Sequence, residues 1–170
     1  MSDNVYLGNP NLKKANTAIE FTQEQILEFM KCKEDPVYFA NNYIKIVSLD
    51  EGLTQFHPYH FQEKLINNFH ENRFNICKMP RQTGKSTTVV SYLLHYAVFN
   101  DSVNIGILAN KAATARELLG RLQTAYENLP KWMQQGIIAW NKGSLELENG
   151  SKILAASTSA SAVRGMSFNI

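Results

Sequence analysis

Apolar residues recur along the chain with two different periods, one typical of helices and one typical of strands. Segments of the two kinds follow one another along the chain, which predicts a mixed α/β protein. Spacing of three to four residues marks helices over residues 22–33, 58–70, 85–99 and 111–129. Short continuous or alternating apolar runs mark strands over residues 44–49, 74–78, 103–109, 144–147 and 152–155. From residue 74 onward, the order strand, loop, helix, strand, helix is typical of a parallel sheet covered by helices.

Cap and turn residues predict several element boundaries independently of the periodicity. Thr22, followed by Gln25, has the spacing of a capping box at a helix start. Pro36 stands at the first position of a second, short helix. The dipeptide Asn149-Gly150 lies between two strand-like runs and therefore predicts a tight β-hairpin.

The composition adds limits to this picture. The 170 residues carry 17 Lys and Arg against 15 Asp and Glu, which is a net charge of +2, and 44% of them are hydrophobic. This usage excludes a disordered tail, a collagen-like chain and a strongly basic nucleic-acid arm. No apolar run reaches the ~20 residues of a membrane span, the N-terminus lacks the pattern of a secretory signal, and two cysteines are too few for a disulfide framework. We expect a soluble domain of a reducing compartment without a membrane partner.

Polarity changes along the chain predict three regions. Residues 1–20 are polar and Asn-rich, which is typical of a flexible arm. Residues 21–70 form an N-terminal helical segment, and residues 71–170 carry the strand–loop–helix pattern of a nucleotide-binding core.

The strongest chemical signal is a Gly-Lys-Ser-Thr run between a predicted strand and a predicted helix, which is the context of a P-loop or Walker A motif. Backbone N–H groups at a helix N-terminus and the helix dipole favour anions there, so Lys85 can neutralise phosphates and Ser86 can bind Mg²⁺ beside the nucleotide. The pattern departs from the usual motif at Met79, where a glycine is expected. We expect ATP and Mg²⁺ as cofactors, held by Gln82, Thr83, Gly84, Lys85, Ser86 and Thr87.

Three further polar residues are candidates for the nucleotide site, and each could instead be an ordinary surface residue. Arg81 can reach a γ-phosphate as a planar fork, or it can be a solvent-facing loop residue. Gln62 can pair with adenine through its amide, or it can be an exposed helix residue. Arg164 can be an arginine finger toward a neighbouring subunit, or a surface residue beside a glycine. With Lys85, the two arginines are the expected catalytic residues.

Two weaker patterns are set aside. Residues 46–51 resemble a Walker B strand with an acidic end, but they precede the phosphate loop, whereas the usual order is the reverse. His57 and His60 have no third ligand in the local pattern, so a metal site there is disfavoured.

Several segments together resemble the large terminase subunit of tailed bacteriophages, and most closely its T-even-like type. They include the deviant Walker A run and the Phe61-Gln62 pair. The resembling segments are residues 11–16, 35–40, 61–62, 81–87, 136–144, 149–151 and 162–168.

The resemblance implies a fold and an activity. The fold is a RecA-like P-loop ATPase domain with a small N-terminal helical subdomain, followed in the same polypeptide by a metal-dependent nuclease domain. The activity is ATP-driven packaging of viral double-stranded DNA into procapsids by a ring of subunits. The implied partners are the DNA, the portal protein and the small terminase subunit, in the host bacterial cytoplasm and transiently at the portal. In that family the counterpart of Arg81 lies against the γ-phosphate, that of Arg164 is a proposed trans-acting finger, and that of Gln62 contacts adenine.

One departure concerns residues 161–170, which contain no acidic residue that can complete a Walker B motif. The family's Walker B strand and catalytic glutamate are expected to begin at or just past Ile170. We therefore expect a fragment, whether a piece of a longer chain or the product of a split gene, with an incomplete parallel sheet and no turnover of its own. The alternatives are a fragment of a helicase or restriction-type translocase, and a non-catalytic terminase fragment recognised by a host anti-phage sensor.

Overall fold

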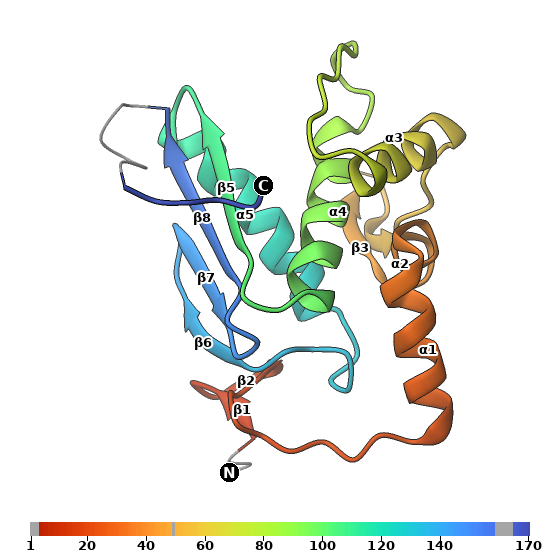
Figure 1. Cartoon of the computed structure of the whole chain (residues 1–170), viewed down its shortest axis with the longest axis vertical. Coiled ribbons are helices and arrows are strands. Elements are labelled where there is room, and N and C mark those ends of the chain that lie inside the picture. The colour runs from red at the N-terminus through yellow and green to blue at the C-terminus, as the bar shows by residue number, and fades with distance from the viewer. Residues whose placement is uncertain (1–3, 49, 159–164) are drawn as a thin grey trace.

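The computed structural model describes residues 4–48, 50–158 and 165–170, which form a sheet layer, a middle layer of two helices and an N-terminal helical layer (Figure 1). The elements are β1 (Val5–Tyr6), β2 (Asn9–Lys13), α1 (Gln23–Glu34), α2 (Pro36–Tyr43), β3 (Lys45–Ser48), β4 (Gly52–Gln55), α3 (His60–Glu71), α4 (Lys85–Phe99), β5 (Asn104–Ala109), α5 (Ala112–Glu127), β6 (Ile137–Trp140), β7 (Ser144–Leu147) and β8 (Lys152–Ser157). The α/β class is therefore confirmed.

The main sheet has the strand order β5-β8-β7-β6 and is mixed rather than purely parallel. Strands β5 and β8 are parallel and are paired from Asn104 with Lys152 to Ala109 with Ser157, whereas β7 is antiparallel to both of its neighbours. The predicted hairpin at Asn149-Gly150 joins β7 to β8, and Gly150 has the left-handed φ of 81° that such a turn favours. Among the described strands of this sheet, only β5 and β8 form the parallel pairing that the sequence predicts.

Helices α4 and α5 form the middle layer, where most of the core lies. Helix α5 packs on β5 and β8, and α4 packs between α5 and the helices α2 and α3 (Figure 1). Because α4 has neighbours on several sides, its buried residues do not form a single stripe, and they include Ser91 and His95 as well as apolar side chains. This explains why α4 reads as an almost continuous apolar run in the sequence.

The predicted cap at Thr22 and the predicted helix start at Pro36 are confirmed. Thr22 Oγ1 accepts a hydrogen bond from the Gln25 N–H (3.2 Å), and the Thr22 N–H donates to Gln25 Oε1 (3.1 Å). The Asp35 carboxylate accepts from the Val37 N–H (2.9 Å) at the start of α2, where Pro36 occupies the first turn. The local sequence therefore determines where these two helices begin.

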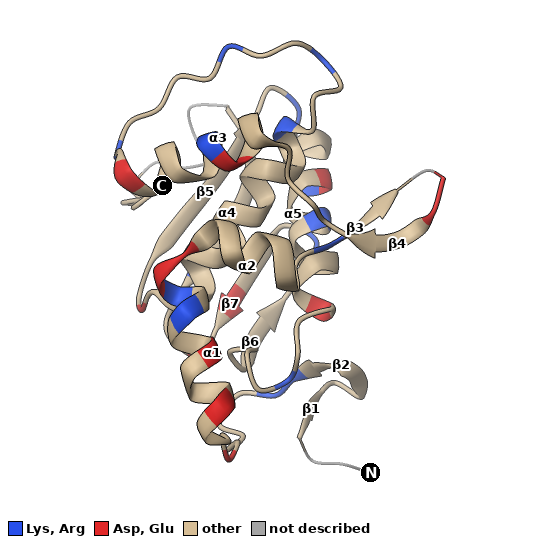
Figure 2. Cartoon of the chain, turned by 90° about the vertical axis from the view of Figure 1, so that its right-hand side faces the viewer, with Lys and Arg blue, Asp and Glu red and all other residues tan. Residues whose placement is uncertain are grey.

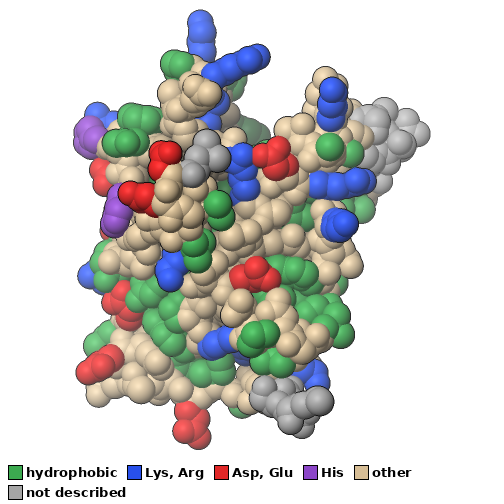
Figure 3. Space-filling view, turned by 180° about the vertical axis from the view of Figure 1, so that it is seen from behind, with side chains coloured by type: hydrophobic (Ala, Val, Ile, Leu, Met, Phe, Trp, Pro, Cys, Tyr) green, Lys and Arg blue, Asp and Glu red, His purple; other side chains and the backbone are tan. Residues whose placement is uncertain are grey.

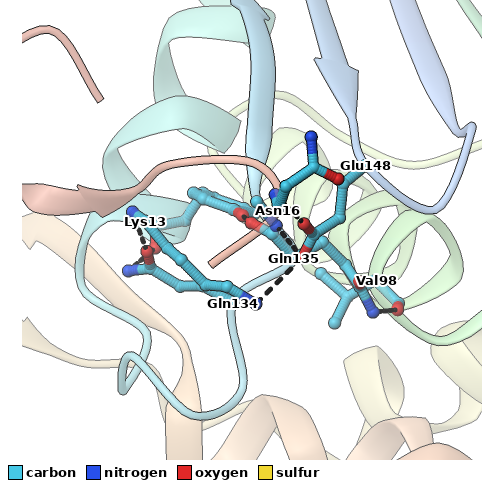
Figure 4. Close-up of polar contacts among 8 residues, drawn as sticks. Lys13, Asn16, Val98, Gln134, Gln135 and Glu148 are labelled. Atoms are coloured by element: carbon cyan, nitrogen blue, oxygen red, sulfur yellow. Dashed lines mark hydrogen bonds and ion pairs between the residues drawn. The ribbon is translucent and has the colours of Figure 1, made fainter. Parts of the chain in front are cut away.

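Residues 4–16 do not form the flexible arm that their polar composition predicts. They contain the β1–β2 hairpin, and Leu12 is buried in the core at 1% exposure. The Glu148 carboxylate accepts from Lys13 Nζ (2.8 Å) and from the Asn16 N–H (2.9 Å), and Gln134 Oε1 accepts from the Lys13 N–H (3.0 Å; Figure 4). The prediction fails because these partners lie more than 100 residues away along the chain.

The predicted strand over 74–78 is wrong. The segment forms neither a strand nor a helix, and the side chains of Phe74 and Ile76 are open to solvent, at 85% and 102% exposure. The outer edge of β5 is occupied instead by the end of the chain, where the Gly106 N–H donates to the Ile170 carbonyl (2.8 Å) and the Asn169 N–H to the Asn104 carbonyl (2.8 Å). A strand needs a partner for its backbone groups, and no described strand lies beside 74–78.

Candidate phosphate-binding site

The site is built from a turn over residues 79–84, which we call the candidate loop, and from the first turn of α4. Gly84 is the N-cap of α4 and has left-handed backbone angles (φ 71°, ψ 15°), and Gln82 is also left-handed at φ 61°. The first N–H groups of a helix have no partner inside it, so those of Lys85, Ser86 and Thr87 remain available at the loop. This arrangement favours an anion at the start of α4.

The side chain of Lys85 lies back across the candidate loop. Its ammonium group donates to the carbonyl oxygens of Met79 (3.4 Å) and Pro80. The hydroxyl of Thr83 donates to the same Pro80 carbonyl (3.1 Å). These bonds tie the start of α4 to Met79 and Pro80 and keep the ammonium group of Lys85 beside the candidate loop.

Gln62 joins helix α3 to the candidate loop. Its side chain is 3% exposed, although the sequence alternative was an exposed glutamine. Its Oε1 accepts from the Tyr59 N–H (2.8 Å) at the start of α3, and its Nε2 donates to the Thr83 carbonyl (3.2 Å). The structure thus places Gln62 against the candidate loop, with each end of its amide bonded to the protein backbone, and the predicted contact with adenine stays a prediction.

Two aromatic rings beside Gln62 are open to solvent. Tyr59 and Phe61 are 71% and 45% exposed and stack on each other, with ring centroids 5.9 Å apart and an interplanar angle of 10°. Both belong to the start of α3, next to the residue that contacts the loop. They offer a flat apolar surface near the helix start of α4.

The other predicted site residues are more exposed to solvent than Gln62. Arg81 and Gln82 are exposed in the candidate loop, whereas Ser86 and Thr87 are half-buried in the first turn of α4. Lys and Arg residues are spread along the loop between α3 and α4 (Figure 2), namely Arg73, Lys78 and Arg81. The predicted trans-acting Arg164 lies outside the described residues.

The two weaker patterns do not converge on this loop. The Walker B-like stretch forms β3, which pairs antiparallel with β4 in a separate two-stranded sheet. His60 lies 3.5 Å from Glu63 in an exposed pair, and the described part of the chain contains no group of three His, Cys, Asp or Glu residues that could hold a metal ion. None of the described helices is long and apolar enough to cross a membrane.

Sequence reasoning missed a buried histidine in the helix that carries the site. His95 is 2% exposed, and its Nε2 lies 2.8 Å from the Cys32 carbonyl, which links α4 to α1. Burial lowers the pKa of His95 to about 4, although the bond to Cys32 opposes that shift. A polar residue inside the apolar run of α4 was the signal that could have identified it.

The match to known proteins decides the family. Residues 76–170, more than half of the chain, match the family described as "Terminase large subunit, T4likevirus-type, N-terminal". The chain belongs to this terminase family. The resemblance to a T-even-like large terminase subunit is therefore confirmed.

A solved terminase shares the fold. The chain is similar to the crystal structure of the HK97 bacteriophage large terminase, with a TM-score of 0.64 and 18% sequence identity. The similarity covers 80% of this chain but only 29% of the HK97 protein. The matched part thus spans less than a third of the length of that protein.

Proposed function

We propose that this chain is the ATP-binding portion of a large terminase subunit. The observation that carries the proposal is the geometry at the start of α4, where left-handed Gly84 begins the helix and Lys85 folds over the loop. This region lies within the residues that match the terminase family. A closed loop, free helix N–H groups and one movable ammonium group are the features that bind a polyphosphate.

Each residue has a distinct proposed role. The N–H groups at the start of α4 bind phosphate oxygens, and Lys85 exchanges the carbonyls of Met79 and Pro80 for the β- and γ-phosphates. The hydroxyl of Ser86 would help to hold a Mg²⁺ ion, which would supply neutralisation of phosphate charge. Arg81 reaches the γ-phosphate from the loop, and Arg164 of a neighbouring copy adds charge stabilisation in the ring.

Among the described residues, neither the candidate loop nor the first turn of α4 contains an Asp or Glu that could orient an attacking water. We therefore expect this 170-residue chain to bind nucleotide without turning it over. The whole subunit is proposed to hydrolyse ATP, to package double-stranded viral DNA through the portal protein with the small terminase subunit, and to cut the DNA with a further domain, in the host cytoplasm.

One face of the molecule is consistent with weak DNA binding by this portion alone. Seen from behind, acidic and basic side chains are interspersed with apolar patches (Figure 3). Such mixed charge fits the small net charge of +2. Phosphate-backbone binding depends on clustered Lys and Arg, so we expect any DNA affinity of this chain to be low and to fall steeply with salt.

The test is calorimetric titration of the purified chain with ATP and Mg²⁺. Replacing Lys85 with Ala should weaken binding at least about tenfold, because one charge-assisted contact to phosphate is lost. Lys78→Ala, a change of the same kind at an exposed residue just before the loop, should have little effect. Equal affinity of wild type and K85A would contradict the proposal, and steady phosphate release by the wild-type chain would contradict the expectation of no turnover.

A further inference from the structure

Helix α1 carries apolar side chains on its exposed face as well as on its packed face. On the packed face, Cys32 is fully buried and the Phe29 ring lies edge-on against another aromatic ring, with centroids 4.9 Å apart. On the exposed face, Ile26, Leu27 and Met30 are 51%, 68% and 48% exposed. Spacings of three and four residues place Met30 beside the other two, so the three side chains form one patch, which we call the α1 patch. Exposed apolar side chains that lie together mark an interaction surface.

Two charges of opposite sign lie along one edge of the α1 patch. Glu24 and Lys31 are both exposed, and their spacing is close to two helical turns, so they lie on the same side of the helix. Figure 2 shows the acidic side chains in the first half of α1, followed by the basic side chains of the second half. The ammonium group of Lys31 lies 3.7 Å from the centre of the Tyr38 ring, and neither Glu24 nor Lys31 forms an ion pair with any described residue. Both charges are therefore available to a second molecule.

These positions match one another when two copies of α1 pack antiparallel. The midpoint between Glu24 and Lys31 falls within one residue of Leu27, and so does the midpoint between Ile26 and Met30. A two-fold axis at Leu27 therefore places Leu27 against its own copy and Met30 against Ile26 of the second copy. The same axis places Glu24 opposite Lys31 of the second copy, and this happens twice in the pair. A parallel pair would instead place like charges opposite each other, which is unfavourable.

We propose that the α1 patch binds a second copy of this chain, with the two α1 helices antiparallel about a two-fold axis at Leu27. The order of the charges supports a second copy as the occupant, because one sequence supplies both members of each ion pair. The contact is independent of the proposed nucleotide binding. It also differs from the head-to-tail contact that the proposed ring would use, because both copies use the same surface.

The pairing should be weak, because the contact is small. Helix α1 has 12 residues and is therefore about 18 Å long. A single helix of this length covers less than the ~800 Å² per partner of a standard protein–protein interface. We expect a dissociation constant of about 0.1 mM, so that dimers form only in concentrated solution.

Sedimentation equilibrium of the purified chain, from about 10 µM to about 1 mM, tests the pairing. Leu27→Glu places two like charges beside each other at the axis, so it should weaken the dimer at least about tenfold. Leu53→Glu is the matched control, because Leu53 is 50% exposed on β4 and lies outside the α1 patch. The control should dimerise like the wild type. Both leucines are exposed, so neither change should disturb the fold.

Charge reversal tests the antiparallel orientation. Glu24→Lys or Lys31→Glu alone sets two pairs of like charges against each other in the dimer, so each should weaken it about fivefold. The double variant E24K/K31E has opposite charges at both places again, and its affinity should return to within about threefold of wild type. Such a rescue within one chain requires that the two residues meet across the axis.

The outcomes are distinct. A wild-type chain that stays monomeric up to about 1 mM would overturn the proposal. A dimer that L27E weakens no more than L53E would overturn it as well, because the contact would lie elsewhere. A dimer that is lost in L27E but not restored in E24K/K31E would overturn the antiparallel arrangement. None of these measurements needs ATP, so they stay separate from the test of nucleotide binding.

Discussion

The N-terminal hairpin and the segment that leads into the candidate loop contrast in how they are held. Residues 4–16 are mostly polar, yet they are anchored by Glu148, Gln134 and the buried Leu12 (Figure 4). Residues 74–78 contain Phe74 and Ile76, yet both side chains point into solvent. The comparison teaches that anchoring depends on partners supplied by distant parts of the chain, and not on the polarity of a segment itself.

The largest change in the free energy of unfolding should come from Leu12, the buried apolar residue of the N-terminal hairpin. Replacing Leu12 with Ala removes a side chain that is 1% exposed, so we expect a loss of about 3 kcal/mol in the free energy of unfolding. Leu7→Ala is the matched control, because Leu7 lies in the same hairpin at 87% exposure. Urea unfolding of both variants measures the difference. Equal stability of the two variants would mean that the hairpin is not docked.

Glu148, which binds the hairpin through polar contacts, should contribute less than Leu12 to the free energy of unfolding. Burial alone would raise the pKa of Glu148, but the bonds from Lys13, Gly136 and Asn16 hold this pKa below its usual value. Glu148→Gln keeps the shape and removes the charge, so we expect a loss of about 2 kcal/mol in the free energy of unfolding, with faster proteolysis near Asn16.

Glu146→Gln is the control for this charge. Glu146 pairs with Lys152 at 2.9 Å in a more exposed position, so its loss should cost less than about 1 kcal/mol. If E146Q and E148Q destabilise equally, the hairpin is not held by the carboxylate of Glu148.

A smaller loss of stability should appear when the solution is made mildly acidic, and it should come from His95. The pKa of His95 is about 4 in the folded chain and near its ordinary 6.5 when unfolded. The unfolded state therefore binds the proton first, and stability is lost as the pH falls below 6.5. Between pH 7 and 5.5 this group should account for a loss of about 1 kcal/mol.

The variant His95→Gln should remove this part of the pH dependence. Unfolding free energies of wild type and H95Q, measured from pH 7 to pH 5.5, give the contribution of the histidine as the difference in slope. Parallel curves for the two proteins would show that His95 is not held neutral in the core.

The smallest effect should come from the segment before the loop. Ile76→Thr changes a side chain that is fully exposed, so we expect the free energy of unfolding to change by less than about 0.5 kcal/mol. A loss comparable to that of L12A would show that the segment is packed in solution as a strand. Thermal unfolding of I76T beside L12A gives the most direct comparison of the two regions.

Local signals in the sequence were enough for many of the elements. The cap at Thr22, the helix starts at Pro36 and Lys85 and the hairpin at Asn149-Gly150 all lie where short-range patterns predict them. These features depend on residues within three or four positions of one another, so their physics is contained in a short stretch of chain. The chemical roles of Arg81, Ser86 and the other site residues stay predictions.

The sequence by itself determined the α/β class and the phosphate-loop pattern, because periodicity, caps and motif spacing are local properties, and its segments carried the resemblance to terminases. Only the tertiary structure decided that the polar hairpin is docked through Glu148, that residues 74–78 find no partner strand, and that Gln62 is bonded to Thr83. The reason is physical. Each of these outcomes depends on whether a backbone or side-chain polar group meets its partner from another element, and that is settled only when the elements pack together.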